Sequence, residues 1–401
     1  MAQTVFRYLL LLVLMLISSA AYADFDSAKF KLDLTPELRF FPESPADSRQ
    51  LDNSLSFSAL GRADFEWNNG LTKFAASPFV RLDSADSNRS HADLREFELR
   101  HRSGDFDWRI GIGKVFWGTT ESVHLVDIIN QTDAVESIEG EDKLGQPMLS
   151  VAWTGPVGVV SGFLLPYSRE RTLTGVKGRL RAQIPYDTDN AIYESSQGKN
   201  HIDAALRWQY SGGGLDIGVS HFWGTAREPR FVFNQGVPEI MLVPVYDLIN
   251  QTSIDFNFVS GSWIWKLEAL HQSNRIKNFE AVVGGFEYTI PLSNSEFPEI
   301  GLLAEYAWES RDLNSPSIYQ NDLFLGLRIA FNDVAGSEIL TGIMQDMQKD
   351  SRYISLSASR RLEKLGRIAL KLFIFNDIST NDPLLAYARD TYLQIEYTFN
   401  F

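Results

Sequence analysis

The chain has 401 residues, of which 44% are hydrophobic and 12% aromatic, so it is not an intrinsically disordered protein. It contains no Cys, which excludes disulfides, Cys-ligated zinc, iron–sulfur clusters and thiol catalysis. Its 37 Lys and Arg against 51 Asp and Glu leave a formal net charge of −14, which argues against nucleic acid as a partner because phosphates require a basic face.

Residues 1–23 have the organisation of a secretory signal peptide. Arg7 supplies a positive charge, the run 9–17 is apolar, and Ala21 and Ala23 form a small-residue cleavage site. The apolar run is too short to span a bilayer, which requires roughly 20 residues. We therefore predict a cleaved signal peptide, and a mature chain of 401 − 23 = 378 residues with a charge of 36 − 51 = −15.

From residue 30 onward, short segments alternate apolar and polar residues with a period of two. In 51–67, for example, serines alternate with Leu55, Phe57 and Ala59. Successive residues of a strand point to opposite faces, so each segment has one apolar and one polar face. About 18 candidate strands follow this pattern. They lie near 30–40, 51–67, 71–83, 92–103, 105–116, 147–154, 157–166, 200–210, 215–225, 250–260, 262–272, 279–290, 300–310, 321–331, 337–348, 351–361, 366–376 and 389–401.

Strands of a soluble β-sandwich also alternate, but two features favour a membrane barrel. The segments are about 10–12 residues long, the length that a tilted strand needs to cross a bilayer. Aromatic residues gather toward the ends of the apolar faces, as in the aromatic girdles of membrane barrels.

The links between the segments alternate in length, which is the strongest indication. Tight turns such as 68–70 and 103–104 occur at one end, whereas the long links 117–146, 167–199 and 226–249 occur at the other, with 291–299 as an exception on the short side. Short periplasmic turns and long extracellular loops are typical of outer-membrane barrels. We predict an all-β fold over 24–401: a single closed antiparallel transmembrane β-barrel of about 16–18 strands with long extracellular loops.

The last five residues, Tyr-Thr-Phe-Asn-Phe, resemble the terminal strand of Gram-negative outer-membrane proteins. In that family the barrel-assembly machinery reads the final aromatic residue, which is Phe401 here. The resemblance implies a location in the outer membrane of a Gram-negative bacterium, with outer-membrane lipid and the assembly machinery as partners, and it allows a homotrimer. The segments 113–118 and 127–133 are also similar to a large uncharacterised porin-like family, although Gln131 stands where that family has Pro.

Two short sequence motifs, here called the repeated words, each occur twice and in the same order. Phe-Trp-Gly-Thr occurs at 116–119 and 222–225, and Asp-x-Ile-Asn-Gln-Thr occurs at 127–132 and 247–252. One interpretation is that two loops fold into the lumen and narrow it with carboxylate and amide groups. The other is that each Trp is an interfacial aromatic followed by a turn, and that the second word packs a loop against the wall. The candidate constriction residues are Trp117, Asp127, Asn130, Gln131, Trp223, Asp247, Asn250 and Gln251.

The polar faces of the strands are expected to line the lumen. Their charges are of both signs, which argues against a strongly anion- or cation-selective pore. Either water solvates these side chains, or they pair across strands and stiffen the wall. The candidates are Arg62, Asp64, Glu66, Lys73, Arg81, Asp107, Arg109, Asp203, Arg207, Lys266, Glu268, Glu305, Arg328, Lys371 and Glu396.

The sequence contains no zinc-binding His-Glu-x-x-His motif, phosphate-binding glycine loop or Gly-x-Ser-x-Gly elbow, and we predict neither catalytic residues, metal nor cofactor. The predicted function is a porin-like channel for passive diffusion of small hydrophilic solutes through a charged, loop-narrowed lumen. The alternative is a closed or plugged barrel whose extracellular loops serve adhesion, assembly or surface binding. A barrel enzyme would require a convergent group of Ser, His and acidic side chains.

Overall fold

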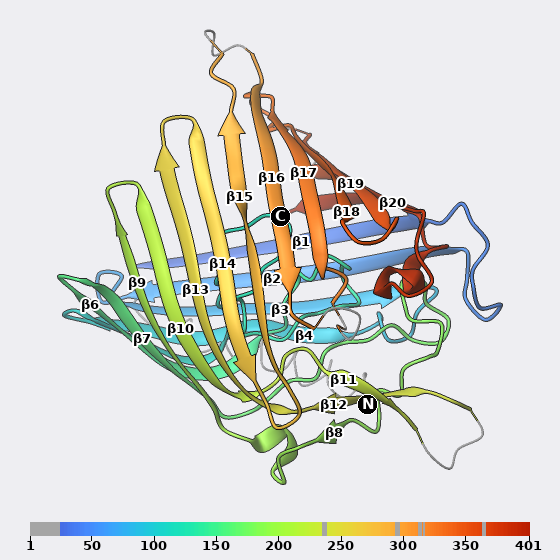
Figure 1. Ribbon diagram of the computed structural model, residues 1–401. Coiled ribbons are helices and arrows are strands. Elements are labelled where there is room, and N and C mark those ends of the chain that lie inside the picture. The colour runs from blue at the N-terminus through green and yellow to red at the C-terminus, as the bar shows by residue number, and fades with distance from the viewer. Residues whose placement is uncertain (1–24, 235–238, 293–296, 312–314, 316, 363–365) are drawn as a thin grey trace.

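The computed structural model describes residues 25–401 except 235–238, 293–296, 312–314, 316 and 363–365 (Figure 1). The predicted signal peptide, 1–23, lies outside the described residues. In the part of the chain that is described, no helix is both long enough and apolar enough to cross a membrane.

Eighteen strands form one sheet, and each predicted segment overlaps one of them, which confirms the all-β barrel. The barrel strands are β1 (Ser27–Phe40), β2 (Asn53–Trp67), β3 (Thr72–Asp83), β4 (Ala92–Ser103), β5 (Phe106–Gly113), β6 (Gln146–Gly155), β7 (Gly158–Leu165), β9 (Asp203–Gly212), β10 (Leu215–Thr225), β13 (Leu248–Ser260), β14 (Trp263–Ser273), β15 (Asn278–Thr289), β16 (Glu299–Glu309), β17 (Asn321–Ala330), β18 (Glu338–Asp346), β19 (Arg352–Arg361), β20 (Arg367–Asn376) and β21 (Tyr392–Asn400).

The barrel is closed by its first and last strands. β1 pairs with β2 along one edge and with β21 along the other, both antiparallel. The final residue takes part in this seam, because Phe401 N donates to Leu32 O (2.9 Å) and Leu32 N donates to Phe401 O (3.0 Å). Closure leaves no unpaired sheet edge, which a strand in hydrocarbon could not tolerate.

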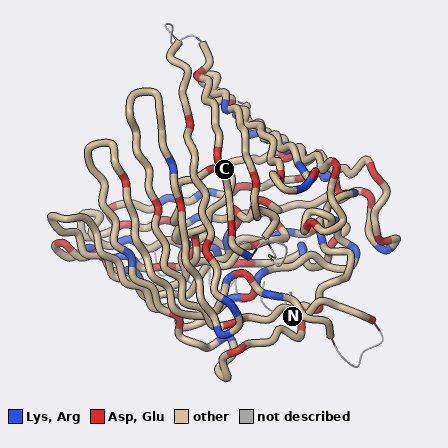
Figure 2. The backbone as a smooth tube through the Cα atoms, viewed as in Figure 1, with Lys and Arg blue, Asp and Glu red and all other residues tan. Residues whose placement is uncertain are grey.

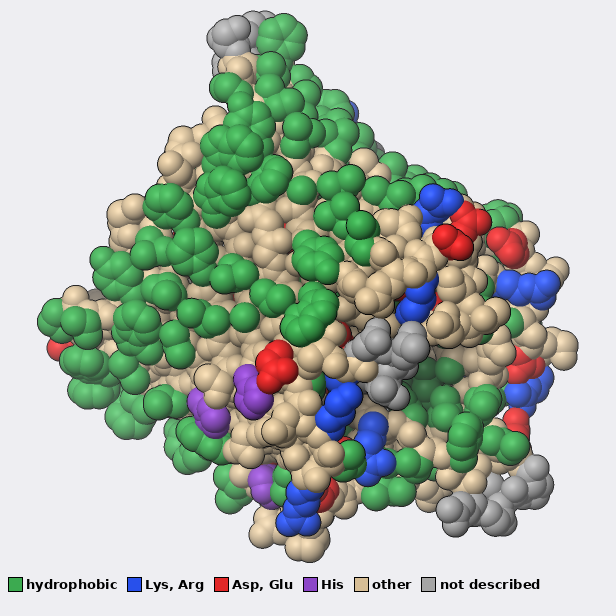
Figure 3. Space-filling model, in the orientation of Figure 1, with side chains coloured by type: hydrophobic (Ala, Val, Ile, Leu, Met, Phe, Trp, Pro, Cys, Tyr) green, Lys and Arg blue, Asp and Glu red, His purple; other side chains and the backbone are tan. Residues whose placement is uncertain are grey.

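The period-two pattern places apolar residues outside and polar residues inside. In β2, Leu55 and Phe57 are 62% and 45% exposed, whereas Ser56 is 3% exposed. Figure 3 shows hydrophobic side chains covering much of the outer face of the strands that face the viewer. Near the short-turn end, Trp263 stacks on Trp265 (5.6 Å between ring centroids) and contacts Tyr288 (4.4 Å). This aromatic group is typical of a membrane-interface girdle.

The two ends of the barrel differ as predicted (Figure 1). At the short-turn end, tight hairpins include Asn68 and Asn69, whose φ angles of 57° and 56° suit a hairpin turn. The link between β15, which ends at Thr289, and β16, which begins at Glu299, is longer than these turns. At the other end, long loops carry a second sheet of β8 (Ile192–Tyr193), β11 (Arg230–Phe233) and β12 (Leu242–Tyr246), and the short 3-10 helices η1 (Gly198–Asn200) and η3 (Pro383–Tyr387).

Candidate functional site

The link between β5 and β6, residues 114–145, enters the barrel; we call it the inner loop. Its first part reaches β14 and β16, which are not neighbours of β5 in the sheet. Thr119 N donates to the Glu268 carboxylate (2.7 Å), and Ser122 N donates to that of Glu305 (2.8 Å). Backbone N–H groups that point at buried carboxylates form charge-assisted hydrogen bonds, so these contacts fix one end of the loop to the far wall.

A second part of the inner loop is attached to the strands around the seam. Asp133 pairs with Arg95 of β4 (2.6 Å), and Glu136 pairs with Arg81 of β3 (2.7 Å). Glu139 pairs with Lys371 of β20 (2.7 Å). Because β3 and β4 lie across the closed sheet from β14 and β16, the inner loop bridges the lumen, and its contact with β20 lies between these walls.

The first copy of the repeated words shapes this loop. The Asn130 side chain accepts a hydrogen bond from Val115 N (2.8 Å) and donates to Gly113 O (2.9 Å). Asp127 accepts one from Trp117 N (3.3 Å). Trp117, Val126 and Ile129 of the loop are buried against apolar residues of the wall, which are Phe163, Leu165, Phe222 and Ile249. The two words therefore bind each other within one loop.

The second copy lies in the wall and does not form a loop inside the lumen. β10 and β13 pair through it without interruption, with Trp223 opposite Asn250 and Thr225 opposite Leu248. The alternation therefore continues, and it turns Trp223 (46% exposed) and Asn250 to the outer face. For the second copy the structure therefore agrees with packing in the wall, and of the two copies only the first lies outside the paired strands.

The other two residues of the second copy point inward and are buried. Asp247 is 8% exposed and pairs with Arg230 (2.8 Å) at the start of β11. Gln251 is 2% exposed, and its side-chain amide donates to Ser253 Oγ (3.1 Å). Gln131, its counterpart in the first copy, is fully buried and donates to Arg169 O (3.1 Å). These polar groups hold loops to one another and to the wall.

The predicted lumen-lining residues lie on the strand face opposite to the exposed apolar residues, but they differ in exposure. Those that are buried are Arg81, Asp203, Arg207, Glu268 and Glu305. Those that are partly exposed are Glu66, Asp107, Arg109, Lys266, Arg328, Lys371 and Glu396, and those that are exposed are Arg62, Asp64 and Lys73. The exposed members belong to the short-turn half of β2 and β3, so water-accessible charge is concentrated away from the inner loop.

Many of these charges pair across strands, and Figure 2 shows both signs interspersed along the chain. Arg207 makes a bidentate pair with Asp255 (2.7 and 2.9 Å), and its guanidinium lies 5.0 Å from the ring centroid of Trp117. Arg328 bridges Glu121 of the inner loop (2.6 Å) and Glu287 of β15 (3.1 Å). Such pairs stiffen the wall and neutralise it locally.

Asp203 holds other loops in place and does not line open space. It is fully buried and pairs with Arg227 (3.0 Å), while accepting hydrogen bonds from Thr225 N (2.9 Å) and Ser168 Oγ (3.0 Å). The links 166–202 and 226–247 are thus attached to the end of β9 beside the inner loop.

A buried ion network at β1 to β3 was missed by the sequence analysis. Glu37 forms ion pairs with Arg81 (2.9 Å) and Arg89 (2.8 Å), and Arg89 also pairs with Asp83 (2.8 Å). The signal was available for Glu37, because it alternates with the apolar Leu38 in the same way as the residues that were selected. Its partner Arg89 lies in a link between strands, where alternation gives no information.

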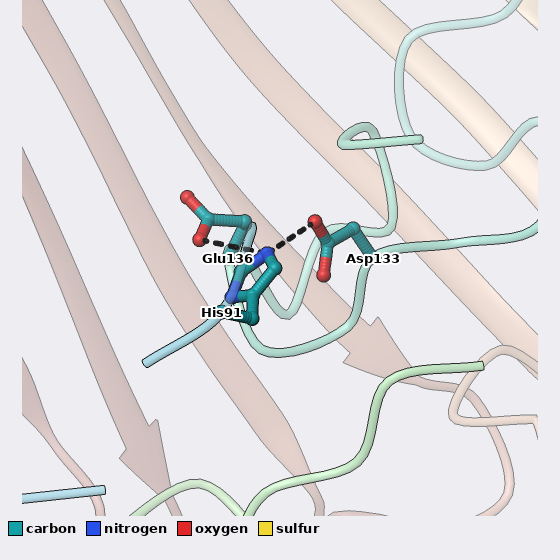
Figure 4. A group of neighbouring side chains, drawn as sticks. All are labelled: His91, Asp133 and Glu136. Carbon is teal, nitrogen blue, oxygen red and sulfur yellow. Dashed lines mark hydrogen bonds and ion pairs between the residues drawn. The ribbon is translucent and has the colours of Figure 1, made fainter. Parts of the chain in front are cut away.

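His91, Asp133 and Glu136 lie close enough to be considered as a metal site, with ligand atoms within 4.8 Å of one another (Figure 4). Each carboxylate already receives a guanidinium, Arg95 at Asp133 and Arg81 at Glu136. A metal cation would have to displace these guanidinium groups, so we interpret the three side chains as part of an ion-pair network that holds the inner loop.

The same contacts shift the pKa values of two of these groups. Burial opposes the charged form of His91, but the hydrogen bond and the charge of Asp133 (3.2 Å) raise the pKa of His91 above its ordinary value. Burial also disfavours the Asp133 carboxylate, yet the hydrogen bond with His91 and the charge of Arg95 hold the pKa of Asp133 well below its ordinary value. The Asp133 carboxylate is therefore charged at neutral pH, and the contact favours the protonated form of His91 relative to a free imidazole.

One sector of the interior is apolar. Inward-facing residues of β17 to β21 form a buried cluster that Ile138 of the inner loop and Leu180 of the link 166–202 cover. Its members include Phe324, Met344, Tyr353, Phe373, Phe375 and Tyr392. Between this sector and the ion network, a cavity of about 30 Å³ has room for little more than one water molecule. The interior is therefore closely packed at this point.

Solved structures of outer-membrane proteins have the same fold. Pseudomonas aeruginosa OccK8 (OprE) matches with a TM-score of 0.54 and 12% identity, covering 94% of this chain and 98% of that one. Pseudomonas aeruginosa OccD3 (OpdP) matches with a TM-score of 0.53 and 9% identity, covering 95% and 92%. A trimer form of Vibrio cholerae OmpT is more distant, with a TM-score of 0.47, 10% identity and coverage of 94% and 100%.

No protein-family model and no curated protein sequence matches the chain. At such identities the structural likeness establishes the fold alone. The chain has the fold of Gram-negative outer-membrane porins, as its terminal strand and strand pattern predict.

Proposed function

We propose that this chain is a channel of the outer membrane for passive diffusion of small hydrophilic solutes. The observation that carries the proposal is the inner loop, which is attached to Glu268 and Glu305 on one wall and to Arg81 and Arg95 on the other. A loop fixed across the lumen of a porin fold narrows the path and limits solutes by size.

The path begins in the short-turn half, where Arg62, Asp64 and Lys73 are exposed on the luminal face. We propose that these residues contact the solute and that the buried members of the predicted set position the inner loop. Charges of both signs alternate along the path, so the channel discriminates weakly between anions and cations and passes neutral hydrophilic solutes. The mechanism is diffusion, without a cofactor or an energy input.

Planar-bilayer recording of the refolded protein tests this proposal. The expected result is a series of discrete conductance steps, together with liposome swelling by small sugars that declines with sugar size. Folding is checked by the heat-dependent shift in electrophoretic mobility that closed barrels show. A folded preparation that produces neither steps nor swelling would contradict the channel.

The alternative is a closed barrel whose long loops bind at the cell surface, in adhesion or assembly. The apolar sector of the interior favours it, because Phe324, Tyr353 and Phe373 point inward from β17 to β20 and are buried in a cluster against loop residues. The second sheet of β8, β11 and β12 also gives the loops a fixed structure. The two functions separate experimentally, since a closed barrel conducts nothing while retaining binding that depends on 166–202 or 226–247.

The localisation and the partners belong to the same proposal. The apolar outer face would contact outer-membrane lipid, and the assembly machinery would read Phe401, whose side chain is 71% exposed at the seam. Removal of Phe401 is expected to lower the yield of inserted barrel in cells. A homotrimer is the proposed assembly; native electrophoresis of the extracted protein would show it as a band at three times the monomer mass.

A further inference from the structure

A groove on the outer face of β18, β19 and β20 has an apolar floor; these strands are labelled in Figure 1. Its volume is about 300 Å³, and its floor includes Ile339, Ala358, Ile368 and Leu370. Ala358 lies opposite Ile339 on one side and opposite Leu370 on the other. A methyl side chain between two large ones leaves a hollow in the lipid-facing surface. In a membrane, a lipid acyl chain can occupy this hollow and contact the side chains around it.

The groove faces lipid and not the lumen. Along β19, Ile354 is 37% exposed and has the same parity as Ala358 and Arg360. Tyr353 has the opposite parity and is buried in the apolar cluster of the interior. Because strand residues alternate between faces, Arg360 points outward like Ile354.

Arg360 therefore places a guanidinium at the short-turn end of the lipid-facing surface. Its side chain is 58% exposed, and its acidic contact among the described residues is Asp333, at 3.7 Å. An exposed pair at this distance contributes little stability, so the guanidinium remains available to a ligand. The Asp333 carboxylate accepts hydrogen bonds from Ser337 N (2.8 Å) and Ser337 Oγ (2.7 Å) and keeps further lone pairs for a ligand donor. An outward Arg on a barrel costs about 2–4 kcal/mol at the membrane midplane but about 0–1 near the interface, which fits a position at the strand end.

The rim of the groove carries charges of both signs. Asp333 lines it together with Arg360 and the hydroxyl residue Ser337, whereas Glu338 and Ser359 have the luminal parity and bind each other (2.8 Å). A guanidinium binds phosphate through two parallel hydrogen bonds, whereas carboxylates accept hydrogen bonds from an ammonium group. The rim thus complements a head group that contains both a phosphate and a primary ammonium.

We propose that this groove binds a phospholipid of the phosphatidylethanolamine type in the periplasmic leaflet. The phosphate lies on Arg360, the ammonium on Asp333, and an acyl chain lies over Ala358 between Ile339 and Leu370. Phosphatidylcholine shares the phosphate, but its quaternary ammonium has no N–H to donate. Phosphatidylglycerol has no head-group cation. The inference goes beyond solute passage and rests on the proposed membrane location.

A second outer groove provides an internal control. It has a volume of about 400 Å³ over β1 to β3 and is lined by apolar residues such as Phe30, Leu32 and Ala63. Arg62 also lines this groove, but its guanidinium is paired with Asp33 (3.5 Å) on the luminal face. This groove has room for an acyl chain but lacks an outward pair of opposite charges, so it should bind lipids without head-group preference.

Native mass spectrometry of the folded barrel, incubated with equal amounts of phosphatidylethanolamine, phosphatidylcholine and phosphatidylglycerol, tests the proposal. The wild type should retain phosphatidylethanolamine preferentially, and Arg360→Ala should lower that retention about tenfold, or about 1.4 kcal/mol. Asp333→Asn should remove the preference over phosphatidylcholine. Ala358→Leu, which fills the floor, should lower retention of the lipid without changing any charge.

Two variants serve as matched controls. Arg102→Ala removes an arginine at the same end whose side chain is 67% exposed and whose acidic contact, Asp107, is at 3.6 Å, but which lies on the luminal face. Ala63→Leu fills the second groove. Both should leave the preference intact. Equal retention of the three lipids, a preference for phosphatidylglycerol, or unchanged retention in folded Arg360→Ala would overturn the proposal. Conductance recorded on the same preparations reports separately on the channel.

Discussion

Glu268 is the contact whose removal should most disturb the inner loop. It is fully buried on β14, and its carboxylate accepts hydrogen bonds from Thr119 N (2.7 Å), Thr120 N (3.1 Å), Thr120 Oγ1 (2.8 Å) and Val126 N (3.2 Å). Replacement by Ala removes every one of these acceptors and leaves buried donors without partners. We therefore expect Glu268→Ala to release the first part of the loop from the far wall.

The size of the effect follows from these contacts. A hydrogen bond to a charged group contributes about 1.5–3 kcal/mol, so a net loss of about 3 kcal/mol is a low estimate after relaxation of the loop. At 1.4 kcal/mol per factor of ten, the undocked population of the loop rises about a hundredfold. The barrel itself should persist, because its backbone ladder does not include Glu268 side-chain contacts.

Single-channel recording is the assay for this variant. Glu268→Ala should show a larger or noisier open-channel current than the wild type, and Glu268→Gln, which keeps one acceptor oxygen, should be intermediate. Glu280→Gln is the matched control, since that carboxylate pairs with His271 (2.9 Å) and both side chains are more than half exposed. Identical current traces from Glu268→Ala and the wild type would refute the role given to the loop.

Three further predictions concern the same loop and wall. Since the folded pKa of His91 is raised, its contribution is present below the unfolded value of about 6.5 and is lost as pH rises through the folded pKa, so thermal stability should fall across this window in the wild type but not in His91→Phe. Arg207→Ala leaves Asp255 buried without its guanidinium and should destabilise the barrel by about 3–5 kcal/mol in urea unfolding, with Arg207→Lys closer to the wild type. Asn130→Ala should make the inner loop sensitive to protease in folded protein, because it loses hydrogen bonds to Val115 and Leu144; equal resistance would contradict this role.

The barrel could be predicted from the sequence because its determinants are local. Each determinant can be recognised within a few residues: the alternation of Leu55 and Phe57 with serines, the turn at 68–70 and the terminal Phe401. The path of the inner loop could not be predicted, because Glu268 lies 149 positions from Thr119 and nothing in either segment identifies the other.

The two copies of the repeated words show the same limit. Trp117 and Trp223 have identical neighbours in the sequence, yet Trp117 is buried in the inner loop and Trp223 is exposed on β10. Strand pairing decides between them, since β13 continues to pair beside Trp223. The apolar interior was missed for a different reason: 372–375 is apolar on both faces, a pattern typical of a strand that is buried on both sides.

The account is tested most directly by thiol labelling during single-channel recording, because the chain has no Cys and a single introduced thiol is unique. Glu121 lies on the inner loop beside Arg328, and Leu55 lies on the outer face with 62% exposure. A bulky thiol reagent should lower the conductance of Glu121→Cys and leave that of Leu55→Cys unchanged. Conductance that is absent, or that does not respond to labelling at Glu121→Cys, would contradict a lumen narrowed by this loop.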